Sequence, residues 1–272
     1  MSLLTRPSAA GDALVLRAWP CGETSAVASL LVREQGFVKV LAKGARQPRS
    51  RLRALVEPGR LVNVEFGLDP ARDLQYLRGG GVVLDPMAEG ATLERSAYLL
   101  GALELVDRCR PAAAGPGGPG EELLFGVCER FVGMLSSPAC REPALLFFAL
   151  EWRLLDRHGT APQVDRCSCC GADPAGGEAG GAWFQPAEGG LVCGRCTAAG
   201  AAAGARPVDP PTLALLRRLG AGDLAAAAAA GADPGVRREA GVLLHRFLGY
   251  HLPGYRLPAA LDLLRAGKDR RG

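Results

Sequence analysis

The chain has 272 residues, enough for two or three domains with buried cores. Although 48% of the residues are hydrophobic, no run of eighteen apolar residues occurs, so a membrane span is not expected. Residues 1–80 carry twelve Lys/Arg and seven Asp/Glu, a net +5, whereas the rest carry twenty against twenty-one, a net −1. This asymmetry indicates a polyanion-binding N-terminal third on a nearly neutral body.

Residues 12–84 are expected to form short β-strands. Apolar or alternating runs cover 13–19, 25–32, 37–42, 61–66 and 74–84. Turn-forming sequences such as PCGE and EPG separate these runs. Five short strands are the inventory of a small Greek-key barrel such as the OB-fold, although the pattern leaves other strand orders open. We therefore predict an α+β multidomain chain whose first domain, residues 1–84, is a five-stranded OB-fold barrel.

Helical periodicity replaces the strand pattern after Pro86, and residues 85–272 are predicted to form a helical domain. The segment PAAAGPGGPG (111–120) is expected to be a flexible loop between two helices, and 144–159, apolar nearly all round, to be the central helix of a bundle. The alanine run at 225–230 favours a helix. The apolar faces expected on the first, second and last helices are Leu93, Ala97, Leu100, Leu103 and Val106; Leu124, Val127, Cys128, Phe131 and Leu135; and Val236, Ala240, Leu243, Leu244, Phe247, Leu248 and His251.

Two CxxC pairs are the strongest local signal in the chain, and they predict a zinc-binding element at residues 162–200. Two tight turns that face each other can supply four thiolates at tetrahedral positions. The CxxC-G register makes Cys167, Cys170, Cys193 and Cys196 the ligands and leaves Cys169 as a bystander. The glycines of the two motifs, Gly171 and Gly194, suit turns that need a positive φ.

Other functions of the two CxxC pairs are less well supported by the sequence. A redox pair would normally accompany a βαβ pattern, which the sequence lacks. A catalytic zinc would call for His or carboxylate ligands, and no HExxH motif is present. We therefore expect one closed, structural Zn²⁺ per chain.

A basic segment at residues 38–53 is the candidate nucleic-acid-binding site. Its sequence, VKVLAKGARQPRSRLR, contains no acidic residue and mostly follows the third predicted strand as a loop. A solvated charged surface is the simpler interpretation, but the charge asymmetry and the position on a barrel favour nucleic acid. Because the second and third strands offer only Phe37 for stacking, phosphate contacts should dominate. The candidate nucleic-acid-binding residues, and the DNA-binding residues if the ligand is DNA, are Lys39, Lys43, Arg46, Arg49, Arg51 and Arg53.

The sequence contains no recognisable catalytic set. A P-loop motif is absent, and His158, His245 and His251 have no matching nucleophiles. An N-terminus without the apolar run of a signal peptide, together with an odd number of cysteines, favours a reducing compartment. We therefore expect a cytoplasmic protein without enzymatic activity.

Several segments together resemble the RecO family of bacterial DNA-repair proteins, over nearly the whole chain. The most specific are GETS (22–25), AKGAR (42–46) with its basic continuation, and CSCCG…GGLVCGRC. The late segment LLHRFLGYHLPGYRLPAALDLL adds to the resemblance, and GETS is interpreted as a structural turn. This chain departs from the family in the additional Cys169 and in Gly/Ala-rich insertions at 111–120 and 171–182.

The resemblance implies a recombination mediator rather than an enzyme. It implies binding of single- and double-stranded DNA and annealing of complementary strands. It also implies action with RecR in loading RecA onto DNA coated by single-strand-binding protein, whose acidic C-terminal tail would be contacted. Such a protein would be cytoplasmic and associated with the nucleoid. Two alternatives remain open: a zinc-containing enzyme that processes nucleic acid, and an adaptor without its own DNA role.

Overall fold

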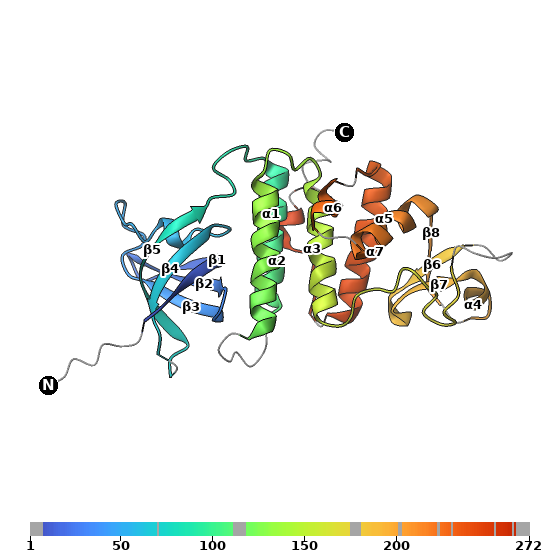
Figure 1. Ribbon diagram of the computed structural model, residues 1–272, viewed down its shortest axis with the longest axis horizontal. Coiled ribbons are helices and arrows are strands. Elements are labelled where there is room, and N and C mark those ends of the chain that lie inside the picture. The colour runs from blue at the N-terminus through green and yellow to red at the C-terminus, as the bar shows by residue number, and fades with distance from the viewer. Residues whose placement is uncertain are drawn as a thin grey trace. The chain divides into compact units, whose positions relative to one another are not determined.

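The structure is a computed structural model that describes residues 8–69, 71–110, 118–174, 181–200, 203–221, 224–229, 231–252, 254–262 and 264 (Figure 1). The chain forms two compact units: unit 1 comprises Met1–Ala139 and Pro258–Gly272, and unit 2 comprises Cys140–Leu257. Most of the loop predicted at 111–120 lies outside the described residues. Among the helices of the described chain, none combines the length and hydropathy needed to cross a bilayer.

Unit 1 begins with the predicted barrel. Its strands are β1 (Ser8–Cys21), β2 (Ser25–Val32), β3 (Gly36–Ala42), β4 (Leu61–Gly67) and β5 (Leu74–Leu84). They close in the order β1-β2-β3-β5-β4, with β3 and β5 parallel and the other pairs antiparallel (Figure 1). Five strands at the expected places and this order confirm the OB-type barrel.

Alternation along the strands fills the interior of the barrel with small and branched side chains. The interior cluster includes Val15, Ala28, Leu30, Val64 and Phe66, all 0% exposed. Four further hydrophobic residues of β1 and β2 are buried without belonging to this cluster: Leu14, Leu16, Val27 and Leu31. They mark an outer face of the barrel that other elements must cover.

Two helices of unit 1, α1 (Leu93–Arg108) and α2 (Pro119–Ser136), pack against that outer face. Helix α1 begins where the Thr92 side chain accepts a hydrogen bond from the Arg95 N–H (3.1 Å). Arg33, which directly follows β2, forms an ion pair with Glu129 of α2 at 2.8 Å. The barrel and these helices therefore share one packed interface. The domain boundary expected after residue 84 remains a prediction.

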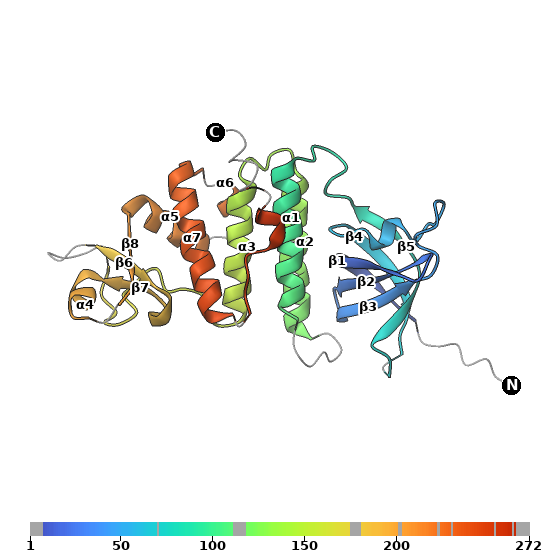
Figure 2. The ribbon, with the colours of Figure 1, turned by 180° about the vertical axis from the view of Figure 1, so that it is seen from behind.

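The apolar face predicted for α1 is partly wrong. Leu93 and Leu100 are 59% and 46% exposed, although Ala97, Leu103 and Val106 are buried as expected. The helix buries a wider surface because a returning segment, the short red helix beside α1 in Figure 2, also packs on it. Side-chain atoms of Pro258 and Leu261 lie 3.4 Å from the position of a Cβ on Gly101. The additional buried residues are Leu99, Gly101, Ala102 and Leu105.

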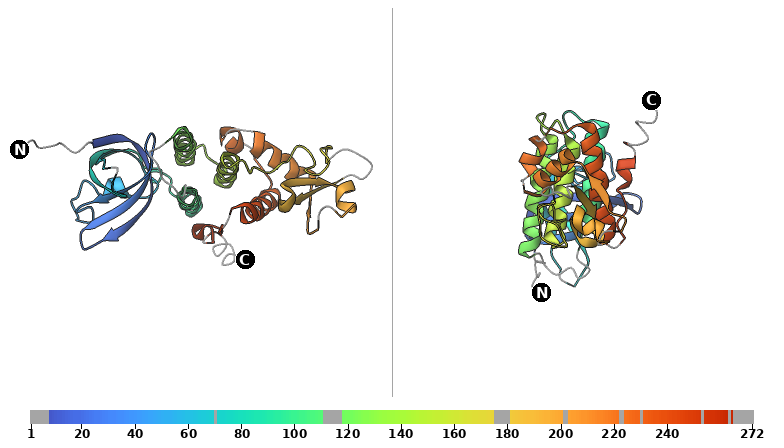
Figure 3. Two further views of the ribbon diagram at one scale, coloured as in Figure 1. Left: turned by 90° about the horizontal axis from the view of Figure 1, so that it is seen from below. Right: turned by 90° about the vertical axis from the view of Figure 1, so that its right-hand side faces the viewer.

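Unit 2 is built around α3 (Pro143–Arg157), which is buried along nearly its whole length, as predicted for 144–159. The helices α5 (Pro210–Ala221), α6 (Leu224–Ala229) and α7 (Pro234–His251) pack against it. The left view of Figure 3 looks roughly along α3 and α7. Gly241 admits the Phe148 ring, whose Cζ lies 2.7 Å from where a Cβ would stand. The predicted apolar faces of the second and last helices are buried at most of the named positions.

A small sheet in unit 2 has no counterpart in the sequence predictions. Its strands β6 (Ala182–Gln185), β7 (Gly190–Cys193) and β8 (Arg206–Val208) are ordered β7-β6-β8. The turn η2 (Pro186–Glu188) joins β6 to β7, and the short helix α4 (Gly194–Ala198) follows β7. Phe184 of β6 packs on Phe247 of α7 with ring centroids 5.8 Å apart, which ties this sheet to the helical core.

Candidate metal centre and nucleic-acid interface

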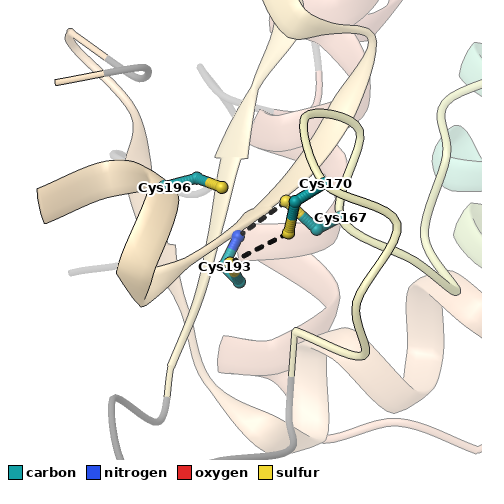
Figure 4. A group of neighbouring side chains, drawn as sticks. All are labelled: Cys167, Cys170, Cys193 and Cys196. Carbon is teal, nitrogen blue, oxygen red and sulfur yellow. Dashed lines mark hydrogen bonds between the residues drawn. The ribbon is translucent and has the colours of Figure 1, made fainter. Parts of the chain in front are cut away.

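Four cysteines of unit 2 converge on one point. Cys167 and Cys170 lie in a tight loop, Cys193 ends β7, and Cys196 lies on α4 (Figure 4). Their sulfurs all lie within 4.8 Å of one another, and Cys170 and Cys193 are 3.7 Å apart. Sulfurs around a tetrahedral Zn²⁺, with bonds of about 2.3 Å, would be about 3.8 Å apart. The donor set and its dimensions thus fit a single metal ion.

The first loop takes the shape expected from its glycine. Gly171 has a φ of +73° and donates its N–H to the Cys167 carbonyl at 2.8 Å, which turns the chain back on itself. Gly194 does not: it opens α4 and has no positive φ, so that expectation was wrong. The second pair uses a strand-to-helix junction in place of a second tight turn.

Cys169 lies outside the cluster. It is exposed, and its Sγ is 3.7 Å from Oε2 of Glu188. Desolvation of the thiol and the negative charge of Glu188 raise its pKa. A thiol that keeps its proton is a poor metal ligand.

The surroundings of the cluster favour thiolates at some positions and oppose them at others. Burial works against ionisation of Cys167, but the backbone N–H groups of Cys193, Cys170 and Cys169 outweigh it and lower its pKa to about 6. The Cys193 N–H lies 3.3 Å from that sulfur. Hydrogen bonding with Cys170 raises the pKa of Cys196. Because neighbouring thiolates repel one another, the four thiols cannot all be ionised without a cation, and a bound metal ion would offset this repulsion.

Positive charge stands beside the cluster as well. The Arg195 guanidinium lies 3.7 Å from the Cys170 sulfur, and the Ala172 N–H together with this guanidinium lowers the pKa of Cys170. Four thiolates around a divalent ion leave a net charge of −2, which Arg195 partly offsets. Arg217 of α5 donates to the Val164 carbonyl at 2.9 Å and so joins the segment just before Cys167 to the helical core.

Residues 43–53 of the basic segment, here called the basic loop, form a series of hydrogen-bonded turns between β3 and η1 (Ala54–Val56), whereas Lys39 lies within β3. Ala45, Leu55 and Val56 are buried in the barrel's interior cluster. Because these apolar residues are held inside, the charged residues between them point outward. Arg49, Arg51 and Arg53 are exposed, and none of their side chains has a hydrogen bond or ion pair with any described residue.

The other three predicted cations have partners within unit 1. Lys39 forms an ion pair with Asp73 at 2.6 Å. The Lys43 ammonium lies 4.9 Å from the centroid of the Tyr76 ring. Arg46 donates to the carbonyl oxygens of Gly22 and Glu23 at 3.1 and 3.2 Å. The segment therefore divides into three unpartnered arginines and three cations with structural contacts.

Arg46 joins the two N-terminal motifs of the sequence. GETS forms the β1–β2 turn, as interpreted, and AKGAR binds it: the Arg46 N–H donates to the Thr24 carbonyl at 2.8 Å. The Gly44 N–H also donates to the Ser25 hydroxyl at 3.3 Å. The two motifs thus depend on each other.

The stacking surface considered on the second and third strands is closed. The Arg110 guanidinium, just beyond α1, lies 4.9 Å from the Phe37 ring centroid. Arg110 also donates to the Ser29 hydroxyl (2.6 Å), which in turn donates to Asp107 of α1 (2.8 Å). The chain's own helices therefore occupy this face.

An OB-type barrel with a basic loop, followed by helices and a four-cysteine element able to hold a metal, defines a multidomain OB-fold protein. Residues 8–84 match the family model "Recombination protein O N terminal", and residues 90–260 match "Recombination protein O C terminal".

The chain is also similar to several proteins named DNA repair protein RecO. That of Anaeromyxobacter sp. (strain Fw109-5) is 37% identical over 260 residues, 93% of this chain and 94% of that one. That of Nocardioides sp. (strain ATCC BAA-499 / JS614) is 32% identical over 246 residues, 89% and 93% of the two chains. The chain belongs to the RecO family of bacterial DNA repair proteins, which confirms the resemblance and a role in DNA repair.

Proposed function

We propose that this protein is a recombination mediator without enzymatic activity, which binds single- and double-stranded DNA and anneals complementary strands. The observation that carries the proposal is the set of three exposed, unpartnered arginines, Arg49, Arg51 and Arg53, on one loop of the barrel. Guanidinium groups that repel one another and lack acidic partners gain most from phosphate contacts. Lys39, Lys43 and Arg46 complete the proposed DNA-binding set.

Annealing follows from the same contacts. Neutralised phosphates reduce the repulsion between two strands, and contacts restricted to the backbone leave the bases free to pair. The barrel is the proposed DNA-binding domain, and the protein would act in the cytoplasm at the nucleoid.

The metal in this proposal is Zn²⁺, held by Cys167, Cys170, Cys193 and Cys196. Four sulfur donors favour zinc over oxygen-preferring ions, and a closed set of four leaves no open position for catalysis. When bound, the ion would stabilise the small sheet rather than take part in chemistry. The site lies in unit 2 and the basic loop in unit 1, so the two tasks use different residues.

The proposed protein partners are RecR, the acidic C-terminal tail of single-strand-binding protein and, indirectly, RecA. Family membership supports them. The apolar side chains of 144–155 give no separate support for a groove that could bind the tail, because α3 packs against α5, α6 and α7. Calorimetry with a tail peptide at low salt tests this interaction.

A strand-annealing assay tests the main proposal. Complementary oligonucleotides with fluorescent labels are mixed with the wild type and with the triple variant Arg49→Ala, Arg51→Ala, Arg53→Ala. The control triple variant, with the same change in charge, replaces Arg206, Arg238 and Arg246, which are exposed in unit 2. We expect the loop variant to anneal at nearly the protein-free rate and the control to match the wild type. Equal rates in all three would refute the assignment, and shortened strands would support the enzymatic alternative.

A further inference from the structure

Beside the basic loop, the outer face of β5 is uncovered. Burial alternates along the strand: Gln75 and Leu77 are buried, whereas Leu74 and Tyr76 are 37% and 39% exposed. Tyr76 pairs with Leu41 of β3 and with Gly67 of β4. Its ring thus projects from the outside of the barrel, where β3 ends and the basic loop begins, and one neighbour is a glycine without a side chain to shield it.

Lys43 continues the outer face of β3, two residues beyond Leu41, and its ammonium lies 4.9 Å from the centroid of the Tyr76 ring. Lys43 is exposed and has no acidic partner in the described part of the chain. An exposed cation–π contact is weak, and the flexible lysine stem can move the ammonium to a phosphate while the ring stays in place. An aromatic ring beside backbone-binding cations is the combination that holds unpaired nucleotides.

The other aromatic side chains of the barrel strands are less suited. Phe66 is 0% exposed in the interior, and Phe37 is covered by Arg110. Trp19 is half-buried on β1, with the Arg17 guanidinium 5.6 Å from its ring centroid. Tyr76 alone among the aromatics of the described strands combines exposure with a cation of the basic loop.

We infer that Tyr76 stacks on one unpaired base of a DNA strand whose phosphates contact the basic loop. This inference rests on the proposed function and adds a basis for distinguishing single from double strands. A base within a duplex already stacks on its neighbours and cannot reach the ring, whereas a single-stranded base can turn outward. Phosphate contacts still supply most of the affinity, and Tyr76 supplies the preference for single-stranded over double-stranded DNA. When the bound strand pairs with its complement, the base leaves the Tyr76 ring. The protein's affinity for the annealed product is therefore lower than for the single strand.

Dissociation constants for a single-stranded oligonucleotide and for the matching duplex test the inference. The variants are Tyr76→Leu and Tyr76→Phe, with Tyr250→Leu, a 61% exposed tyrosine of unit 2, as the control. We expect Tyr76→Leu to weaken single-strand binding about tenfold. Duplex binding and the salt dependence should not change, because no phosphate contact is lost. Tyr76→Phe should retain the preference, and Tyr250→Leu should behave as the wild type.

A Tyr76→Leu variant that melts like the wild type but binds both DNA forms unchanged, or loses both equally, overturns the inference. The triple arginine variant of the loop tests the proposed function separately, because it should weaken both forms together. Loss in that variant without an effect at Tyr76 refutes the stacking role alone. A wild-type chain that binds neither form refutes the proposed function, and the stacking role with it.

Discussion

Replacing Arg49, Arg51 and Arg53 with alanine should change the salt dependence of DNA binding by a predictable amount. Four of the six proposed cations, these three and Lys43, have no hydrogen bond or ion pair with a described residue, whereas Lys39 is paired with Asp73. Arg46 is occupied by backbone carbonyls. Four phosphate contacts on a single strand give a slope of log affinity against log salt of about −2.8, at about −0.7 per contact.

The variant retains one of these cations and should show a slope of about −0.7. Between 50 and 200 mM salt, the affinity should fall about fiftyfold for the wild type and about threefold for the variant. Fluorescence anisotropy with a labelled oligonucleotide at five or six salt concentrations measures both slopes. The control triple variant of Arg206, Arg238 and Arg246 should keep the wild-type slope. An unchanged slope in the loop variant would show that this loop is only a solvated surface.

Three further outcomes are expected. Metal analysis should find one zinc per chain in Cys169→Ser but none in Cys170→Ser, and the reverse result would refute the assigned ligands. Gly241→Ala should lower the free energy of unfolding by about 1–3 kcal/mol in denaturant titration, because its Cβ would press on the Phe148 ring 2.7 Å away. Arg46→Ala should reduce the melting temperature by about 2–4 °C, since the β1–β2 turn loses its braces, and unchanged melting would contradict that role.

The barrel could be predicted because its strands are short apolar or alternating runs that strong turn signals separate. Four of the five strands both begin and end within one residue of the expected positions; β1 begins earlier, at Ser8 in place of Ala13. Residues Ser8–Leu14 pair with β4. Their sequence, SAAGDAL, has no strand pattern of its own, so this part of β1 depends on its pairing with β4.

The periodicity of the sequence could not predict that Leu93 and Leu100 are exposed. A hydrophobic stripe identifies a helix but not which neighbours it has, and α1 touches both the barrel and the segment at Pro258–Leu261. The β6–β7 hairpin was missed for a related reason. Its strands have only four residues each and lie within the span read as the spacer of a metal site.

The candidate sites could be predicted in composition but not in detail. Spacing alone identified the four cysteines that meet and the one that does not. Charge alone identified the basic loop, yet gave no sign that Arg46 binds the GETS turn or that Lys39 has Asp73 opposite it. Those partners are distant in sequence, so only the closed barrel brings them together.

Unit 1 is discontinuous in sequence, since Met1–Ala139 is joined by Pro258–Gly272. The barrel, α1 and α2 are therefore synthesised first. Leu261, which covers the surface at Gly101, is added only after more than a hundred further residues have been translated. Unit 2 is made in that interval and can fold as an insertion. A nascent chain stalled in unit 2 would expose the apolar surface around Gly101, and tags or truncations at the C-terminus would act on the unit that contains the N-terminal barrel.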